Sequence, residues 1–437
     1  MNRFMIAGTK SGCGKTTVTC AVLAAMKARG LDVCAFKAGP DYIDPGFHRS
    51  VMGVPSHNLD SFFCASKILC TVLGEYSRQY SVIEGVMGFY DGGDTSAHRI
   101  SEITETPAVI VIDCQGMSDS VGAVMNGFLN YRKPSNIAGF IFNRLPQQLA
   151  GMAQKLCREM GTEFFGTFPR CGEGFHSRHL GLIQAQETED IQKKLSILAE
   201  RAEECLNIDA LLNLTGAAPK NRLLSEIKPV ADVTIAVASD SAFSFTYPEN
   251  LDILRKLGCR TVLFSPLEDS CIPQADGLIL SGGYPELHLK KLSGNTTMLE
   301  SVRQFCKSGK PFIAECGGYM YLTGEITAEN GLHYPMAGVF PGECARGDRL
   351  RNFGYVTLIP EEDSLLFRKG SNVPAHEFHY WHSSQPGEGL TAQKRDGRSW
   401  RTGHTSPWYY AGFPHLYFPA DISLAKRFVK MCAERKI

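Results

Sequence analysis

The chain has 437 residues, of which 43% are hydrophobic, enough for two or three globular domains. Its 45 basic and 45 acidic residues balance, so no basic surplus points to nucleic acid or an anionic membrane surface as a partner. No run approaches roughly eighteen apolar residues, and the 15 cysteines lack paired CxxC spacing. We therefore expect a cytoplasmic protein with reduced thiols that acts on small molecules.

The chain begins with the pattern of a phosphate-binding loop. Residues 8–17 read GTKSGCGKTT and follow an apolar run, residues 3–7, that predicts a strand. Backbone N–H groups of such a loop face an anion, the lysine reaches the β- and γ-phosphates, and the first threonine ligates Mg²⁺. The loop is a variant, because five residues rather than four separate Gly8 from Gly14. The residues predicted to bind ATP are Gly12, Gly14, Lys15, Thr16, Thr17 and, at a later strand end, Asn143.

Short apolar runs alternate with helical patterns from residue 3 to about 169 and again from residue 233 to about 314. This alternation is typical of mostly parallel, doubly wound sheets, whose ligands bind outside the carboxyl ends of the strands. We predict two α/β domains, residues 1–190 and 231–437. A helical and then mixed connection joins them over residues 191–230.

Charged side chains follow two predicted strand ends in the first domain. Asp41 comes after the strand at residues 33–37, and Glu84 and Asp91 come after the strand at residues 81–83. Phosphoryl transfer needs Mg²⁺, which prefers carboxylate ligands, although capping and turn closure are the alternative roles of each residue. The glycines after Glu84 are expected to let a ligand approach the backbone. The metal site is predicted to consist of Thr16, Asp41 and Glu84.

Further polar residues of the first domain have less specific patterns. For His57, Asn58 and Asp60 the sequence leaves two roles open, which are contact with the substrate and closure of a turn or capping of a helix. Lys10 is either the signature lysine of a related ATPase group or a solvated surface lysine. The region that holds the substrate or the acyl phosphate is predicted to include Lys37, Asp44, His48, Asp91 and Arg178.

The second domain carries a nucleophile pattern. Residues 312–322 read FIAECGGYMYL, which predicts a strand, a sharp turn at Cys316 and the start of a helix. A cysteine at such a turn is held in strained backbone geometry, and we expect the helix N-terminus to lower the pKa of its thiol. Upstream, Gly282 and Gly283 end a strand and offer N–H groups for an oxyanion hole.

A cysteine nucleophile needs a base, and three histidines are candidates. His415 lies in a late apolar turn, whereas His376 and His379 alternate along a predicted strand. Spacing alone does not choose among them.

A nucleotide site and a thiol site on one chain together imply glutamine-dependent, ATP-driven amidation. Over nearly all of its length the chain resembles the cobyrinic acid a,c-diamide synthases. In this family the N-terminal half is similar to dethiobiotin synthetase and the C-terminal half is a triad-type, class I glutamine amidotransferase. The resemblance is carried by residues 12–17, 36–48, 84–92, 178–182, 242–245, 281–286, 315–322 and 376–380.

The resemblance implies that Cys316 is the nucleophile and that His415 activates it. It implies amidation of the a and c acetate carboxylates of cobyrinic acid through acyl phosphates, in cobalamin biosynthesis. ATP, glutamine and a tetrapyrrole carboxylate would be the small-molecule partners, and a homodimer is implied by the resemblance alone. The family commonly has His-Leu-His where this chain has His415-Leu416-Tyr417. The wider class orients its histidine with a glutamate two residues later, a carboxylate that Tyr417 does not supply.

Two alternatives remain open at the level of sequence. The same chemistry on nickel-sirohydrochlorin or hydrogenobyrinic acid would leave the same motifs. A protein of another class, a nucleotide-switched binding ATPase with an inactive C-terminal domain, is favoured by Lys10. That protein would hydrolyse ATP independently of glutamine and would have no glutaminase activity.

Overall fold

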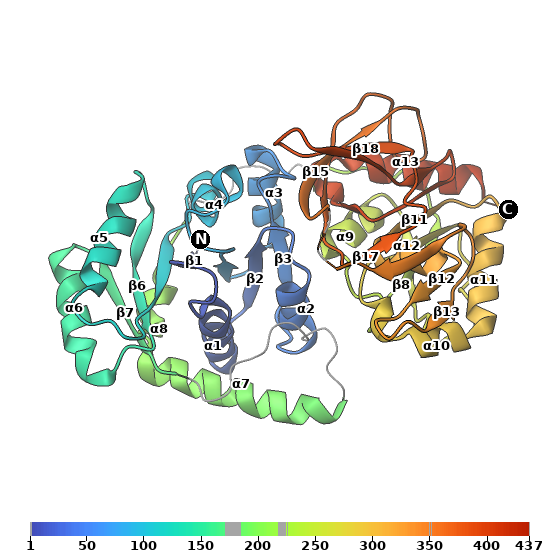
Figure 1. The fold of residues 1–437 in the computed structure, drawn as a ribbon. Helices are drawn as coiled ribbons and strands as arrows, with labels where there is room; N and C mark the ends of the chain where they lie inside the picture. The colour runs from blue at the N-terminus through green and yellow to red at the C-terminus, as the bar shows by residue number, and fades with distance from the viewer. Residues whose placement is uncertain are drawn as a thin grey trace. The chain divides into compact units, whose positions relative to one another are not determined.

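The computed structural model describes residues 2–170, 185–216, 224, 226–348, 350 and 352–436. The chain divides into two compact units, residues 1–225 and residues 226–437, and each is built around its own central sheet (Figure 1). Among the described helices, none combines the length and the apolar character needed to cross a bilayer.

A seven-stranded sheet forms the centre of the first unit, in the order β3-β2-β4-β1-β5-β6-β7. Every neighbouring pair is parallel, so the loops that follow the strands lie together at one edge. Strands buried on both faces read as continuous apolar runs, as β5 does. The strands are β1 (Asn2–Gly8), β2 (Val33–Ala38), β3 (Ser56–Leu59), β4 (Tyr80–Glu84), β5 (Ala108–Asp113), β6 (Ile137–Asn143) and β7 (Glu163–Phe168).

The helix α1 begins directly after the phosphate loop and packs against the long helix α7 (Figure 1). Leu195, Leu198 and Ala202 of α7 are buried in the same apolar core as the side chains of α1. The helices of this unit are α1 (Lys15–Ala28), α2 (Ile43–Ser50), α3 (Ser66–Tyr76), η1 (Gly93–Thr95), α4 (Ala97–Thr104), α5 (Val121–Tyr131), η2 (Gln147–Leu149), α6 (Ala150–Glu159), α7 (Ala185–Cys205) and α8 (Ile208–Leu212).

The edge strand β3 has no counterpart among the predicted strands, because its sequence, Ser-His-Asn-Leu, is largely polar. Its Asn58 is buried, and the side-chain amide donates hydrogen bonds to the carbonyl oxygens of Gly39 (2.9 Å) and Asp41 (2.7 Å). Asn58 therefore holds the loop that carries the predicted metal ligand Asp41.

The second unit has a six-stranded central sheet in the order β20-β21-β11-β10-β8-β9. All of its pairs are parallel except the edge pair β20–β21. This sheet confirms the predicted α/β class. Its strands are β8 (Thr234–Ala238), β9 (Arg260–Phe264), β10 (Gly277–Leu280), β11 (Phe312–Glu315), β20 (His404–Thr405) and β21 (Tyr409–Gly412).

Two smaller sheets, which the sequence did not predict, complete the second unit. One is mixed and has the order β13-β12-β14-β17, and the other is antiparallel and has the order β19-β18-β15-β16-β22. Their strands are β12 (Glu325–Thr327), β13 (His333–Pro335), β14 (Glu343–Arg346), β15 (Gly354–Pro360), β16 (Val373–Glu377), β17 (Trp381–Ser383), β18 (Leu390–Gln393), β19 (Ser399–Thr402) and β22 (His415–Leu416). The helices of this unit are α9 (Pro248–Lys256), η4 (Pro285–Leu287), α10 (Leu289–Gly294), α11 (Thr296–Lys307), α12 (Gly317–Leu322), η5 (Phe418–Ala420) and α13 (Ile422–Glu434).

The packing of α7 on α1 predicts different costs for two neighbouring substitutions. Leu198→Ala removes a buried side chain and should lower the free energy of unfolding of the first unit by about 2–5 kcal/mol. Ile197→Ala removes an exposed side chain from the same helix and should change it by less than about 0.5 kcal/mol. Urea denaturation followed by circular dichroism measures both, and equal costs would contradict this packing.

Candidate functional site

The phosphate loop needs glycine at two positions for its backbone shape. Gly12 and Gly14 have φ angles of +75° and +97°, which side-chain-bearing residues rarely adopt. A Cβ on Gly14 would also lie 2.2 Å from Nδ2 of Asn143. That amide, at the end of β6, donates a hydrogen bond to the carbonyl oxygen of Cys13 (2.8 Å). Asn143 therefore braces the loop, and its contact with the nucleotide stays a prediction.

The side chains that follow Gly14 face the same edge of the sheet. Lys15 lies over the loop, where its Nζ donates to the carbonyl oxygen of Lys10 (3.2 Å), and burial lowers its pKa. The Thr16 hydroxyl donates to Oε1 of Glu84, 2.7 Å away at the end of β4. Thr17 is half-buried in the first turn of α1. The structure thus brings together Thr16 and Glu84, which the sequence placed in one metal site.

Lys37 is at the centre of the charged residues beside this pair. Because β2 and β4 are neighbours, Lys37 is paired in register with Glu84, and its Nζ donates to Oε1 of Glu84 (2.9 Å). The same ammonium donates to Oδ2 of Asp44 (2.5 Å) and lies 3.8 Å from Oδ2 of Asp41. Burial opposes the charge, but Glu84, Asp44 and Asp41 outweigh it and raise the pKa of Lys37. Lys37 is therefore a cation at neutral pH.

The three carboxylates have different environments. Burial raises the pKa of Glu84, and burial together with the Asp44 charge raises the pKa of Asp41 to about 7. At Asp44 burial acts in the same direction, but the Lys37 ammonium outweighs it and holds the pKa below its usual value. His48 lies 4.0 Å from Oε2 of Glu84, and burial lowers the pKa of His48 to about 4, so its ring is neutral at pH 7.

The loop after β4 packs on the phosphate loop. A Cβ on Gly85 would lie 3.1 Å from Cβ of Ala7, and one on Gly88 would lie 3.0 Å from the carbonyl oxygen of Thr9. Gly85 and Gly88 thus allow two parts of the chain to approach each other closely, and the approach of a ligand to this loop stays a prediction. Asp91 is exposed and closes its own turn by accepting a hydrogen bond from the Gly88 N–H (2.9 Å).

Two further basic residues considered in the sequence analysis, Lys10 and Arg178, are not part of the Lys37 cluster that the structure describes. Lys10 is 65% exposed at its side chain and lies 3.5 Å from Asp113, which also pairs with Arg144. Arg178 lies outside the described residues.

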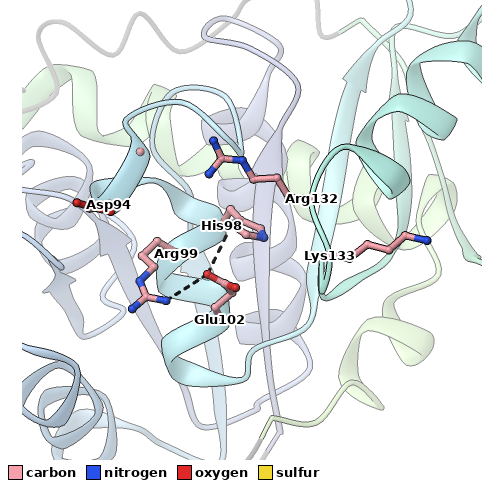
Figure 2. A pocket seen from close by; sticks show the side chains of 7 residues that line it. Asp94, His98, Arg99, Glu102, Arg132 and Lys133 are labelled. Atoms are coloured by element: carbon pink, nitrogen blue, oxygen red, sulfur yellow. Dashed lines mark hydrogen bonds and ion pairs between the residues drawn. The ribbon is translucent and has the colours of Figure 1, made fainter.

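A cavity of about 670 Å³ in the first unit is lined by charged residues of both signs. Figure 2 shows Glu102 between two other α4 side chains: its Oε2 lies 3.8 Å from Nδ1 of His98 and 3.3 Å from Nη1 of Arg99. Arg99 thus balances the charge of Glu102, and the described lining of the cavity contains no predicted site residue. The lining residues are Gly93, Asp94, His98, Arg99, Glu102, Arg132 and Lys133.

In the second unit Cys316 lies between β11 and α12 in the strained backbone conformation that the sequence predicts. Its φ is +49° and its ψ is −106°, and its N–H donates to the carbonyl oxygen of Gly412 (2.7 Å). The expected lowering of the thiol pKa is wrong, however. The thiol is buried, and burial is the largest cause that raises its pKa; the charge of Glu286 and, less strongly, those of Glu377 and Glu315 act in the same direction, whereas the Gly317 N–H lowers it. The helix α12 is only 6 residues long, and its N-terminus does not offset this desolvation.

The predicted oxyanion-hole glycines are next to this turn. A Cβ on Gly317 would lie 3.1 Å from the backbone nitrogen of Gly283. A Cβ on Gly283 would lie 2.1 Å from the carbonyl oxygen of Ala242, so no larger residue fits there without a backbone shift. A Cβ on Gly282 would lie 2.5 Å from Cε1 of His415. The turn at Gly282–Gly283 therefore contacts both the His415 ring and the chain just after Cys316.

The other two histidines are less suited to accept a proton. Both ring nitrogens of His379 face oxygen atoms: Nδ1 lies 2.6 Å from the carbonyl oxygen of Trp381 and Nε2 lies 3.1 Å from Oε2 of Glu377. His376 is opposite His415 in the β16–β22 pair, and burial and the His415 charge lower the pKa of His376 to about 3. His415 is thus the candidate base that the geometry favours.

Both halves of the chain match known protein families. Residues 4–173 match the CobQ/CobB/MinD/ParA nucleotide binding domain, and residues 234–417 match the CobB/CobQ-like glutamine amidotransferase domain. The cobyrinate a,c-diamide synthase of Listeria monocytogenes is 36% identical, over 97% of this chain and 98% of its own length. The chain belongs to the cobyrinate a,c-diamide synthase family. Relatives of the same name from Thermoplasma volcanium (37% identical, 98% of this chain and 97% of the relative) and Salmonella typhimurium (36%, 95% and 95%) agree.

Membership of the cobyrinate a,c-diamide synthase family confirms the two domain types expected from the resemblance, and its nucleotide-binding domain implies the use of ATP. Two buried residues of the thiol site were not predicted. Glu315 accepts a hydrogen bond from the Leu416 N–H (3.1 Å), and Asn250 holds the Leu416 carbonyl oxygen (2.9 Å) and the Phe418 N–H (2.7 Å). Sequence spacing could not reveal these contacts, because Glu315 and Asn250 are far from His415 along the chain. The one hint in the sequence was that Tyr417 supplies no carboxylate, so that another residue had to orient His415.

The raised thiol pKa makes a testable prediction about reactivity. At pH 8 in the absence of glutamine, iodoacetamide should label the exposed Cys271 at least about tenfold faster than the buried Cys316, because the thiolate is the reacting form. Mass spectrometry of the digested protein measures both rates. The urea-denatured chain, in which both thiols should react alike, is the control, and preferential labelling of Cys316 in the folded chain would contradict the prediction.

Proposed function

We propose that this chain amidates the a and c acetate carboxylates of cobyrinate in cobalamin biosynthesis, with glutamine as nitrogen donor and ATP as the activating substrate. The observation that carries the proposal is the pairing of two sites on one chain. One site joins a phosphate loop to Thr16 and Glu84, and the other joins a strained Cys316 to Gly282–Gly283 and His415. The relatives named cobyrinate a,c-diamide synthase cover nearly the whole chain, which supports this choice of substrate.

The thiol half releases ammonia from glutamine. Since its raised pKa leaves Cys316 protonated at rest, the thiol must lose its proton to a base as sulfur attacks the amide carbon. His415 accepts that proton and passes it to the leaving ammonia when the C–N bond breaks. Backbone N–H groups of the Gly282–Gly283 turn stabilise the oxyanion. Water then hydrolyses the thioester, which releases glutamate and frees Cys316.

The ATP half activates the acceptor. A carboxylate oxygen of the macrocycle attacks the γ-phosphorus, which gives an acyl phosphate and ADP. Ammonia then attacks the acyl carbon and displaces phosphate. Lys15 and the loop N–H groups, with Gly12 and Gly14 shaping the backbone, hold the phosphates and offset the charge in the transition state. Lys37, a cation at neutral pH, is proposed to hold the acyl phosphate beside Thr16 and Glu84.

The residues near Thr16 fit a magnesium ion. The Thr16 hydroxyl, Glu84 and Asp41 offer the oxygen atoms that Mg²⁺ prefers, and Oε2 of Glu84 is buried without a hydrogen-bond partner among the described residues. Bound there, Mg²⁺ would neutralise phosphate charge during transfer. Before it binds, the Lys37 ammonium balances these carboxylates.

The remaining expectations stay predictions. The region that holds the substrate or the acyl phosphate is still predicted to include Lys37, Asp44, His48, Asp91 and Arg178, and Asn143 is still predicted to contact the nucleotide. A homodimer is expected from the resemblance and a cytoplasmic location from the composition.

The division of labour between the sites predicts the effect of Cys316→Ala. This variant should lose glutamine-driven diamide formation by at least about 10³-fold and keep ammonium-driven formation within about twofold, because the ATP site is unchanged. The measurement is the mass of the product formed from cobyrinate with MgATP and either glutamine or ammonium chloride.

Glu84→Gln is the reciprocal control, since it alters the ATP site and leaves the thiol site intact. It should lower amidation with both nitrogen donors and keep glutamine hydrolysis. If neither the unchanged chain nor Cys316→Ala amidates cobyrinate while the unchanged chain still hydrolyses glutamine, the substrate assignment is wrong. Parallel reactions with hydrogenobyrinic acid and nickel-sirohydrochlorin then identify the acceptor. ATP hydrolysis without any glutaminase activity would favour the nucleotide switch instead.

A further inference from the structure

The histidine of the thiol site needs a group that fixes its ring, and the residue two positions later does not provide one. Tyr417 is buried and its ring packs edge-on against Tyr247, with ring centroids 4.9 Å apart. A phenol in an aromatic contact carries no charge to stabilise an imidazolium at neutral pH. The orienting group of His415 must therefore come from another element.

Glu315 brings a carboxylate to the His415 ring. It ends β11, directly before Cys316, and is paired in register with Gly412 of β21. Its Oε2 lies 3.5 Å from Nδ1 of His415, and its Oε1 accepts the hydrogen bond from the Leu416 N–H at 3.1 Å. Both oxygens of one buried carboxylate thus face two consecutive residues of β22.

The Glu315 carboxylate faces the ring nitrogen of His415 that does not have to accept the thiol proton. A carboxylate facing Nδ1 favours the tautomer that carries its proton there, which leaves Nε2 to accept a proton from the nucleophile. The ring carbon between the two nitrogens, Cε1, is close to Gly282, because a Cβ added at Gly282 would lie 2.5 Å from it. The ring is therefore held between Glu315 and the predicted oxyanion-hole turn, and contacts of about 3.5 Å in a resting site shorten when substrate binds.

We propose that Glu315 is the positioning residue of the thiol site and replaces the carboxylate that other amidotransferases place two residues after the histidine. During attack the Cys316 proton moves to Nε2 of His415, the S–C bond forms, and the imidazolium gives that proton to the departing ammonia. The Glu315 carboxylate takes no part in this proton transfer and balances the transient imidazolium charge. The assignment rests on the thiol chemistry proposed above and adds the residue that orients its base.

The test compares Glu315→Gln with Glu315→Asp. Glutamine at position 315 keeps an oxygen that can accept the Leu416 hydrogen bond but removes the charge. Glu315→Gln should lower kcat for glutamine hydrolysis by about 10²- to 10⁴-fold and leave KM for glutamine within about threefold. Glu315→Asp keeps the charge on a shorter side chain, so its kcat should be at least about tenfold higher than that of Glu315→Gln.

Ammonium-driven amidation by the same samples corrects for any loss of folded protein, because it uses only the ATP site. The decisive quantity is the ratio of the glutaminase rate to the ammonium-driven rate. Glu377→Gln is the matched control: its carboxylate is buried and its charge also acts on Cys316, but it contacts His379 instead of His415. We expect Glu377→Gln to lower the ratio by less than about tenfold.

A ratio for Glu315→Gln within about threefold of the unchanged chain would overturn the proposal, as would a larger loss in Glu377→Gln than in Glu315→Gln. Equal ratios for Glu315→Gln and Glu315→Asp would also contradict a role for the charge. If the unchanged chain hydrolyses glutamine but amidates no macrocycle, the proposed substrate fails, and glutaminase activity per folded protein, measured by circular dichroism, still decides the role of Glu315.

Discussion

Parallel pairing of neighbouring strands is the constraint on which both sites depend. In the first unit it brings the ends of β1, β2 and β4 to one edge of the sheet, so that Lys37 and Glu84 are opposite each other in register. In the second unit it brings the ends of β10, β11 and β21 together, so that the Gly282–Gly283 turn meets the chain around Cys316. Residues far apart in sequence become neighbours because each lies at or just beyond the carboxyl end of a parallel strand.

The two sites control charge in different ways. At the phosphate loop the buried Lys37 ammonium balances the charges of Glu84, Asp44 and Asp41, so these carboxylates are neutralised within the chain itself. At the thiol site burial keeps Cys316 protonated, and the charge appears when a base removes the proton. A thiol that is neutral at rest is protected from unspecific reaction, at the cost of depending on a well-oriented histidine.

Motifs with local spacing could be predicted from the sequence, whereas contacts set by strand order could not. The phosphate loop, the turn at Cys316 and most strands of the two central sheets follow from short runs of residues and were found, whereas β20 and β21 were not predicted. Strand β3 was missed because Ser56–Leu59 is polar and edge strands need no apolar run. The thiol pKa was predicted in the wrong direction because burial is a tertiary property. Glu315 was visible in the motif, but its contact with His415 depends on the pairing of β11 with β21 and on the position of β22.

The proposed function requires that ATP activates a macrocycle carboxylate for ammonia that the same chain takes from glutamine. The most direct test is an isotope transfer: cobyrinate labelled with ¹⁸O in its carboxylates is converted with MgATP and glutamine, and the inorganic phosphate is examined by mass spectrometry. The account predicts one ¹⁸O atom in phosphate for each amide formed, because the carboxylate oxygen that attacks phosphorus leaves with it. Amide formation with unlabelled phosphate would contradict an acyl phosphate and the proposed coupling of the two sites.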